Sequence, residues 1–455
     1  MKAGFLPLYT ALYDKPGSVL RIRLGEFYDK LTAMLRERGV DVVTNEICTV
    51  KNEFEAAVKK FEDENCEAIF TIHLAYSPSL ESYEALINTK LPIIVIDTTD
   101  TEDFSDNSSP KNISYCHGIH GVMDMCNMLK KNNKLYAIAA GYYEDGAVID
   151  KAVGLLKAAV SANSVKGSKV GSIGGYFNGM GDFQIEDAKL KELYDVEVVY
   201  PKEGELASIT AQITEQEVNA EKERNAKDFK FIGEVDEKVY NDSIKADLTV
   251  KKWIENHNLN ALTINFLGIG DLVTMPFNAC CRAMESGIGY AGEGDKFTAM
   301  FVGGLLKGYK ETSFIEIFCP DWKNNTLFIS HMGEINYAVA DNTPTAFEKK
   351  FAYGNQNSVA ASASFKEGDA VYLNAFVDAK GVNLLISPVK VVKETTDNFI
   401  NSVRGWLDFG KPIDEVLTVI GEYGVTHHSM LVYDTNVTEM KFFADCLGLN
   451  PIIYK

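Results

Sequence analysis

The sequence predicts an α/β protein with two doubly wound, Rossmann-like α/β domains followed by a β-rich C-terminal domain. Short, nearly continuous apolar runs alternate with amphipathic helical stretches over more than half of the chain, and the alternation begins again near residue 166. From about residue 324 strand-like segments dominate. A chain of 455 residues is also too long for one ordinary core, since domains average about 150 residues. We therefore expect domains at residues 1–165, 166–323 and 324–455.

In the first domain, apolar runs mark the strands of a parallel sheet. PIIVID (92–97) is typical of a strand that is buried on both faces, and helices that carry one apolar stripe separate the runs. The expected strands are 1–8, 41–49, 68–72, 92–97 and 134–140, and the expected helices follow residue 19 and span 52–64, 117–131 and 147–162. Right-handed crossovers place the ligand-binding loops at the carboxyl ends of such strands.

The second domain repeats this pattern after SANSVKGSK (161–169), which we interpret as a linker because its residues are small and polar. Its expected strands are 170–173, 196–200 and 261–266, and its expected helices lie around 204–226 and 234–257. The third domain is predicted to be mainly an antiparallel sheet or barrel. Its β-rich segments are LFISHM, INYAVA, AVYLNAFVD and GVNLLISPVKVV, with a hairpin turn at AKG (379–381) and helices near 412–421 and 437–446.

Composition excludes several classes of protein. The net charge is −19 and no dense run of Lys or Arg occurs, so neither nucleic acid nor an anionic membrane is an expected partner. The N-terminus lacks a signal-peptide pattern, and no window approaches the roughly 18 apolar residues of a membrane-spanning helix. We expect a cytoplasmic protein. Its eight cysteines form no C-x-x-C pair, which indicates buried thiols rather than a zinc or disulfide framework.

Candidate catalytic residues lie in the second half of the chain. Glu293 stands in the glycine-rich SGIGYAGEGDKFTA, where small neighbours allow close approach to a ligand. The spacing fits neither phosphate-binding glycine motif, so we reject a nucleotide site. A solvated loop carboxylate is the alternative for Glu293.

Glu316 lies in the apolar run ETSFIEIFCPDW, where a buried charge requires a cation or hydrogen-bond partners. A position on an edge facing water is its alternative.

Histidines complete the candidate set. The chain has seven, of which His331 lies in LFISHMGEI and the pair His427 and His428 lies in GVTHHSMLVY. A single histidine in such a place is more often structural. Two carboxylates with two imidazoles, however, suit Mn²⁺ or another divalent metal of intermediate hardness. Because these residues are far apart in the sequence, their spacing alone does not assemble them into one site.

Four ordered blocks resemble those of L-arabinose isomerases, and VGSIGGYFNGMGDF (170–183) is similar to the strand that opens the central domain in the broader group of L-fucose and L-arabinose isomerase-like proteins. YAGEGDKFTA, ETSFIEI, ISHMGEI and THHSMLVY are similar to that family's GAEGD-like loop, TSFMED-like strand, GAHMLE-like turn and GAHHTV-like strand. The resemblance assigns the metal to Glu293, Glu316, His331 and His428. It also implies two α/β domains, a β-rich C-terminal domain and assembly as a trimer or hexamer.

Other segments extend the resemblance over the chain and show where it departs. SYCHGIHG is similar to a segment of the family whose histidine contacts sugar across a subunit boundary, and this histidine corresponds to His117. The alternative is that His117 only begins a helix. Thr10, in FLPLYTALYD, stands where the family has a sugar-contacting Gln. Lys296 and Phe297 replace Trp-Lys, and Ile317 replaces an acid. These departures alter the wall of the pocket, so we expect either arabinose or another pentose, hexose or modified sugar.

The resemblance implies an aldose–ketose isomerase that acts through a cis-enediol. Glu293 and Glu316 would share metal ligation and proton transfer, and His331 and His428 would hold the ion. His427 would contact a metal ligand or the sugar, with a purely structural role as its alternative. Two other functions remain open: a non-catalytic sugar-binding or regulatory protein, and an isomerase or epimerase of an unusual sugar.

Overall fold

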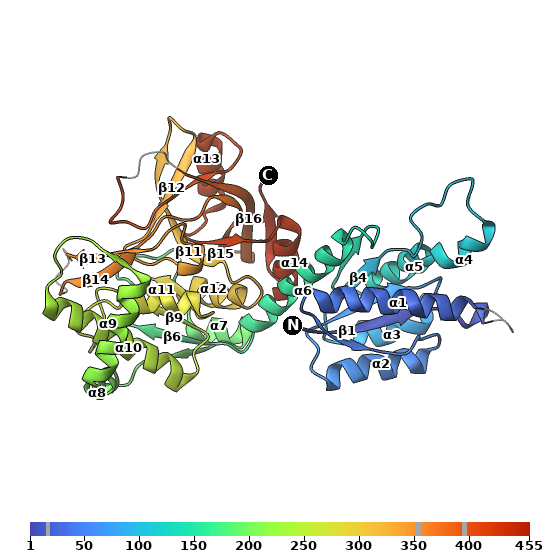
Figure 1. Cartoon of the computed structure of the whole chain (residues 1–455), viewed down its shortest axis with the longest axis horizontal. Helices are drawn as coiled ribbons and strands as arrows, with labels where there is room; N and C mark the ends of the chain where they lie inside the picture. The colour runs from blue at the N-terminus through green and yellow to red at the C-terminus, as the bar shows by residue number, and fades with distance from the viewer. Residues whose placement is uncertain (15–18, 351–355, 394–397) are drawn as a thin grey trace. The chain divides into compact units, whose positions relative to one another are not determined.

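The computed structural model describes residues 1–14, 19–350, 356–393 and 398–455. The chain divides into two compact units, Met1–Val160 and Ser161–Lys455. The first contains a parallel sheet, and the second contains another parallel sheet together with a β-barrel (Figure 1), so the predicted fold class is confirmed. The three domain ranges expected from the sequence stay a prediction.

The first unit is built around a five-stranded parallel sheet in the order β2-β1-β3-β4-β5. Its strands are β1 (Lys2–Leu8), β2 (Asp41–Thr44), β3 (Ala68–His73), β4 (Ile93–Asp97) and β5 (Tyr136–Ala140). Its helices are η1 (Ala11–Tyr13), α1 (Leu20–Glu37), α2 (Lys51–Asp63), α3 (Ser79–Asn88), η2 (Pro110–Asn112), α4 (Ile113–Cys116) and α5 (Gly118–Lys131), and α6 (Ala147–Val165) continues into the second unit. In this order β2 is added on one side of β1 and β3 on the other, so the strand order reverses between β1 and β3. In sheets of this kind, ligands generally bind beside the carboxyl ends of the strands at that point.

The second unit opens with a four-stranded parallel sheet in the order β10-β9-β6-β7. The strands are β6 (Lys169–Ile173), β7 (Glu197–Val199), β9 (Ala261–Ile264) and β10 (Gly289–Gly292). The helices are α7 (Asp187–Tyr194), α8 (Glu205–Ala211), α9 (Glu215–Asp228), α10 (Glu237–His257), α11 (Phe277–Glu285) and α12 (Lys296–Gly308). A small sheet joins β8 (Lys230–Phe231), β13 (Thr345–Lys349) and β14 (Ser358–Ser362).

Six antiparallel strands close into a barrel in the order β15-β18-β11-β12-β17-β16, because β16 pairs with β15 again. They are β11 (Thr312–Asp321), β12 (Thr326–Ser330), β15 (Gly368–Asp378), β16 (Gly381–Val392), β17 (Gly405–Asp408) and β18 (His428–Tyr433). The strand β19 (Asn450–Ile453) is parallel to β16, and η3 (Tyr337–Val339), α13 (Ile413–Tyr423) and α14 (Val437–Leu447) complete the unit. Closure leaves few unpaired strand edges.

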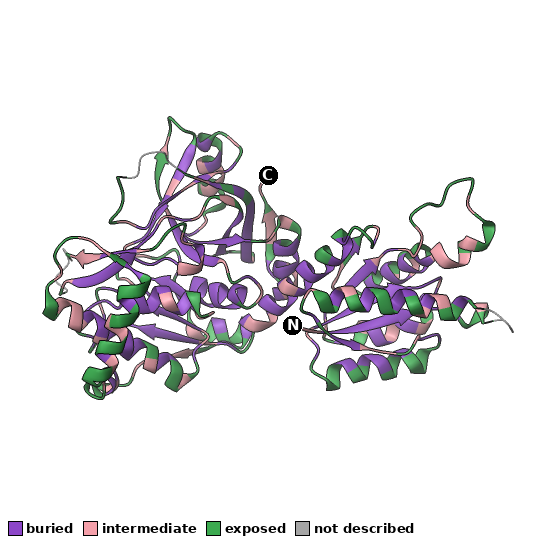
Figure 2. Ribbon diagram, in the orientation of Figure 1, coloured by how far each residue is buried: buried purple, intermediate pink, exposed green. Residues whose placement is uncertain are grey.

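Burial follows the sequence pattern. All four isoleucine and valine positions of IIVID in β4 are buried, and the strands of both units are largely buried while the outer helix faces are exposed (Figure 2). In the barrel, Ile315 of β11 packs in the same core cluster as Ile329 and Leu431. Because side chains alternate along a strand, its neighbours Phe314 and Glu316 point out of the barrel. That outer face packs against α12, which follows β10.

Three details of the sequence prediction were wrong. Residues 161–165 continue α6 instead of forming a linker, because Ala162 and Val165 are buried in an apolar helix face. INYAVA contains the 3₁₀ turn η3, where the Asn336 side chain accepts a hydrogen bond from the backbone of Ala338. The helix expected at 204–226 is divided into α8 and α9, since Thr214 caps a new helix. The AKG hairpin is confirmed by the pairing of Asp378 with Gly381.

None of the helices in the described ranges combines the length and apolar character that crossing a membrane requires.

Candidate metal centre

The strand register of the barrel brings three of the predicted blocks together. β11 runs between β18 and β12, and Glu316 is directly opposite His428 on one side and Ser330 on the other. Opposed residues share one face of a sheet, so the His428 side chain lies beside the Glu316 carboxylate outside the barrel. His331 follows Ser330 at the end of β12.

Glu293 enters from the parallel sheet. It follows β10 at the carboxyl end of the strand, and its backbone has φ = +62°, a left-handed conformation that is uncommon for a residue other than glycine. Gly294 continues the turn with φ = +89°, and a Cβ there would lie 2.2 Å from the carbonyl oxygen of Gly175. Such strained backbone is found often at functional sites. The turn directs the Glu293 carboxylate toward the barrel strands.

Five side chains meet at this point. Nε2 of His428 lies 2.9 Å from Oε1 of Glu316 and 3.5 Å from Oε2 of Glu293. Nε2 of His427 lies 3.4 Å from Oε2 of Glu293 and 3.6 Å from Oε1 of Glu316. Nε2 of His331 lies 3.7 Å from Oε1 of Glu316. We call these five residues the Glu–His cluster.

A carboxylate holds the far side of each imidazole in the cluster. The pairs, with the distance from Nδ1 to the carboxylate oxygen, are His331 with Glu334 (2.6 Å), His427 with Asp182 (2.7 Å) and His428 with Asp295 (2.9 Å). This arrangement fixes each ring so that Nε2 is turned toward Glu293 and Glu316. It is the arrangement found around histidines that ligate metals.

The sequence analysis missed these three acids. Glu334 and Asp295 nevertheless stand inside the quoted blocks ISHMGEI and YAGEGDKFTA, within three residues of a predicted ligand. An acid that close to a ligating residue is the signal that could have found them. Asp182 lies in VGSIGGYFNGMGDF, far from the four blocks in the sequence, and only the fold brings it to His427.

In the Glu–His cluster, carboxylates and imidazoles shift one another's pKa values toward their charged forms. Burial would raise the pKa of Glu293, but the imidazoles of His427 and His428 outweigh it and lower the pKa to about 2. Burial would lower the pKa of His428, but Asp295, Glu293 and Glu316 raise it well above its usual range. Asp182 and Glu293 likewise raise the pKa of His427 to about 9. The pKa of His331 is raised by Glu334 and Glu316 against its burial.

The donor set fits a divalent metal. One ligand atom from each of Glu293, Glu316, His427 and His428 lies within 4.8 Å of the others. Although Nε2 of His428 is close to Glu316, it has no partner in hydrogen-bond geometry among the described residues, while its side chain is fully buried. A buried polar atom without a hydrogen bond marks a place where a cation could bind, displacing the proton from Nε2. Two carboxylate oxygens with imidazole nitrogens suit an ion of intermediate hardness such as Mn²⁺ or Zn²⁺.

Thr10 and His117 lie in the first unit. Thr10 follows β1 by two residues, and His117 precedes Gly118, which packs against His73 at the carboxyl end of β3. The Thr10 side chain accepts a hydrogen bond from the backbone of Leu12 (3.3 Å) and so caps the turn η1. Nδ1 of His117 lies 3.2 Å from the hydroxyl of Tyr13, and its ring stacks against Tyr76 with the centroids 6.0 Å apart. The two residues thus flank the point where the strand order reverses, which is the expected place for a ligand.

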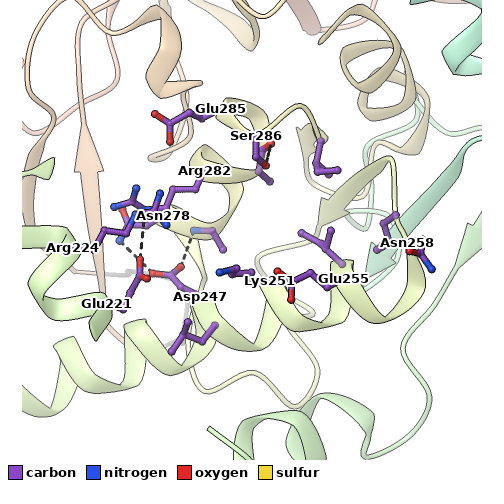
Figure 3. A pocket seen from close by; sticks show the side chains of 16 residues that line it. Glu221, Arg224, Asp247, Lys251, Glu255, Asn258, Asn278, Arg282, Glu285 and Ser286 are labelled. Atoms are coloured by element: carbon purple, nitrogen blue, oxygen red, sulfur yellow. Dashed lines mark hydrogen bonds and ion pairs between the residues drawn. The ribbon is translucent and has the colours of Figure 1, made fainter. Parts of the chain in front are cut away.

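A cavity of about 610 Å³ lies among α9, α10 and α11 (Figure 3), and none of the predicted site residues lines it. Its lining includes Leu259 and Ile288, which precede β9 and β10, so it lies at the end of the sheet opposite Glu293. The buried Asp247 carboxylate belongs to this lining and accepts a hydrogen bond from the backbone of Ala279 at 2.9 Å. Asp247 thereby satisfies a backbone N–H at the start of α11.

Asp247 should make the stability of the fold dependent on pH. Burial raises the pKa of Asp247 to about 7, against the hydrogen bond from Ala279 and with a contribution from Glu221. The folded chain thus binds this proton more tightly than the unfolded chain, and stability is lost as the pH rises from about 4 to 7. In urea unfolding, Asp247→Asn should abolish that loss, on the order of 4 kcal/mol. Parallel pH profiles of the two proteins would contradict this prediction.

Comparison with known proteins identifies similar sequences. Residues 185–307 match a family model described as the L-arabinose isomerase central domain, and residues 311–450 match one described as the L-arabinose isomerase C-terminal domain. L-arabinose isomerase 2 of Bacillus licheniformis is 24% identical over 72% of this chain and 71% of that protein. L-arabinose isomerase of Pediococcus pentosaceus is 25% identical over 80% and 77%, and that of Aeromonas hydrophila is 20% identical over 93% and 88%. All five residues of the Glu–His cluster fall within the two matched regions.

Proposed function

The chain belongs to the L-arabinose isomerase family and is an aldose–ketose isomerase, and from this premise we propose that it acts on its sugar with a divalent metal held in the Glu–His cluster. The observation that carries the proposal is the convergence of Glu293 and Glu316 with imidazoles whose outer nitrogens are all held by acids. A protein that only binds sugar has no need of this arrangement. The non-catalytic alternative therefore finds no support.

The proposed reaction passes through a cis-enediol. A proton leaves C2 of the open-chain aldose and returns at C1, while the hydroxyl proton moves from O2 to O1. A bound Mn²⁺ or similar ion supplies stabilisation of the negative charge on the enediolate oxygens. Glu293 and Glu316 stand close enough to the same point to act as base and acid. General acid–base catalysis by such groups contributes roughly 10²–10⁴-fold to the rate.

The proposed ligands are those implied by the resemblance, namely Glu293, Glu316, His331 and His428. The close grouping of ligand atoms supports Glu293, Glu316 and His428 directly. His331 lies 3.7 Å from Glu316 and is oriented by Glu334, which supports it as the fourth ligand. We propose that His427 contacts the sugar, because its side chain is 37% exposed while that of His428 is fully buried.

We propose that His117 and Thr10 contact the sugar, in a homo-oligomer in which His117 reaches the site of a neighbouring subunit. The place of both residues at the reversal point of the first sheet supports this role. Thr10, Lys296 and Ile317 differ from the family pattern. A pentose or hexose other than arabinose, or an epimerase or isomerase reaction on an unusual sugar, is the second candidate.

The composition supports three further proposals. We propose that the chain works in the cytoplasm. Its net charge of −19 and the lack of a dense run of Lys or Arg support the proposal that neither nucleic acid nor a membrane is its partner. We also propose three domains, at 1–165, 166–323 and 324–455.

A panel of aldoses and ketoses tests the proposed function. The purified protein is assayed with each sugar in the presence of Mn²⁺, then after EDTA treatment, and then after Mn²⁺ is restored. We expect interconversion of at least one aldose–ketose pair that EDTA abolishes and Mn²⁺ restores. Turnover that is independent of metal would refute the proposed role of the ion, and product analysis would separate isomerisation from epimerisation.

His117→Ala should impair turnover and leave the metal in place. Because His117 lies in the first unit and the Glu–His cluster lies in the second, its loss should remove a sugar contact only. We expect kcat/KM to fall by roughly 10-fold or more, the effect of losing one positioning contact. Manganese content, measured by atomic emission, should equal that of the wild type. Loss of metal in this variant would count against the assignment.

A further inference from the structure

The segment between β6 and α7, residues 174–186, contacts the Glu–His cluster at three points. The backbone N–H of Phe177 donates to the carbonyl oxygen of Glu293 at 2.8 Å. The Phe183 ring stacks on His428, with the centroids 4.7 Å apart and the planes 13° from parallel. Asp182 binds His427. We call these residues the β6–α7 segment.

Both ends of this segment are fastened to the protein. Near its start, the Tyr176 carbonyl oxygen accepts a hydrogen bond from the Asn265 side chain at 3.0 Å. Just beyond its end, Asp187 forms an ion pair with Lys296, whose ammonium group also lies 4.4 Å above the Tyr176 ring. Lys296 is buried and begins α12, three residues after Glu293. The contacts of Asp182 and Phe183 are therefore held in place by the turn that carries the cluster.

One carboxylate oxygen of Asp182 contacts both the backbone and the ring of His427. Its Oδ2 accepts a hydrogen bond from the backbone N–H of His427 at 2.9 Å and lies 2.7 Å from Nδ1 of the ring. A contact to both backbone and ring fixes the position of the residue and the rotation of its imidazole. With Nδ1 engaged, Nε2 is left facing Glu293 and Glu316.

His427 occupies a different place from the other imidazoles of the cluster. Its side chain is 37% exposed, whereas those of His331 and His428 are 2% and 0% exposed. His427 is accessible to solvent on one side and faces the two carboxylates on the other, so a small molecule bound beside the carboxylates can contact it. Its orientation therefore matters to a ligand more than to the internal packing.

We propose that Asp182 is a positioning residue for the sugar, holding His427 so that its Nε2 meets a substrate hydroxyl at the mouth of the Glu–His cluster. This inference rests on the proposed function, since it assigns a partner to His427 in the same site. It predicts that Asp182 acts through His427 and has no effect of its own on the metal. Removing Asp182 should then matter only while His427 is present.

A double-mutant cycle tests the inference with two readouts on the Mn²⁺-loaded protein. The variants are Asp182→Ala, His427→Ala and the double variant, with Asp182→Asn as the conservative replacement and Glu186→Ala as the matched control. Glu186 is an exposed acid of the same segment, and its side chain makes no capping hydrogen bond to α7. The readouts are kcat and KM for the best sugar of the panel, and calorimetric binding of the corresponding sugar alcohol, which cannot isomerise.

We expect Asp182→Ala to lower kcat/KM by roughly 10–100-fold, the usual effect of removing the partner of a site histidine. Binding of the sugar alcohol should weaken in parallel, while Mn²⁺ affinity changes less than about threefold. In the His427→Ala background the same replacement should cost less than about threefold, because coupled residues are not additive. Asp182→Asn should recover most of the loss, since its carbonyl oxygen can accept both hydrogen bonds, and Glu186→Ala should match the wild type.

Additive effects of the two replacements, or a loss of Mn²⁺ affinity of more than tenfold in Asp182→Ala, would overturn the inference. Binding of the sugar alcohol tests the role of Asp182 separately from the proposed isomerase function. A wild-type protein that binds a sugar alcohol but turns over no sugar would disprove the isomerase mechanism, while the binding cycle would still test Asp182. A wild-type protein that neither turns over a sugar nor binds a pentitol or hexitol would overturn both.

Discussion

Glu316→Gln is expected to lower kcat by roughly 10³–10⁴-fold, because it removes one ligand charge and one proton-transfer group at once. Oε1 of Glu316 lies 2.9 Å from Nε2 of His428, and it also lies within 4 Å of Nε2 of His331 and His427. The amide has nearly the same shape, so the strand pairing of β11 with β12 and β18 should be retained. The measurement is steady-state turnover at saturating Mn²⁺, with bound metal determined on the same samples.

Glu367→Gln is the matched control for this experiment. Glu367 is an exposed acid just before β15 of the barrel, away from the Glu–His cluster. Its replacement removes the same charge, and we expect activity and metal content equal to the wild type. Full metal-dependent turnover in Glu316→Gln would refute the proposed mechanism.

Asp295→Ala is expected to affect both the metal and the fold. The Asp295 side chain is fully buried, orients Nδ1 of His428 at 2.9 Å and accepts a hydrogen bond from the backbone of Thr298 at the start of α12. Loss of the histidine partner should weaken Mn²⁺ binding by roughly 10–100-fold. Loss of the helix cap and the buried carboxylate should also lower the free energy of unfolding by about 1–3 kcal/mol.

Asp295→Asn separates these two effects. Its carbonyl oxygen can still accept the hydrogen bond from Thr298, so the stability should remain close to that of the wild type, while the charge opposite His428 is lost. Manganese titration followed by electron paramagnetic resonance gives the affinity, and urea unfolding of the metal-free protein gives the stability. Unchanged Mn²⁺ affinity in Asp295→Ala would show that this carboxylate does not orient a metal ligand.

Much of the fold could be predicted because local patterns report burial. The all-apolar PIIVID became the buried strand β4, and the AKG turn joins β15 to β16. The errors arose where local chemistry competes with packing. SANSV in 161–165 is composed of small and polar residues, but Ala162 and Val165 face apolar neighbours, so the helix continues. INYAVA has the residues of a strand, yet the Asn336 side chain satisfies the backbone of a tight turn.

The candidate site could be predicted only in part. Glu293, Glu316, His331 and His428 were proposed from sequence blocks, and the structure places all of them in one cluster. His427 was assigned a lesser role, although its ring nitrogen lies as close to the carboxylates as that of His331. Asp182 escaped notice because it is 245 residues from His427 in the sequence. No local pattern carries information about such a contact.

The sequence by itself determined the order of strands and helices, the acidic and histidine-containing blocks, and the family to which they are similar. These features depend on neighbours within a few residues, which periodicity and motif reveal. Only the tertiary structure decided that Glu316 lies opposite His428 and that the left-handed turn at Glu293 faces them. The physical reason is that closure of the barrel and its packing against α12 set the register between segments that are more than 100 residues apart.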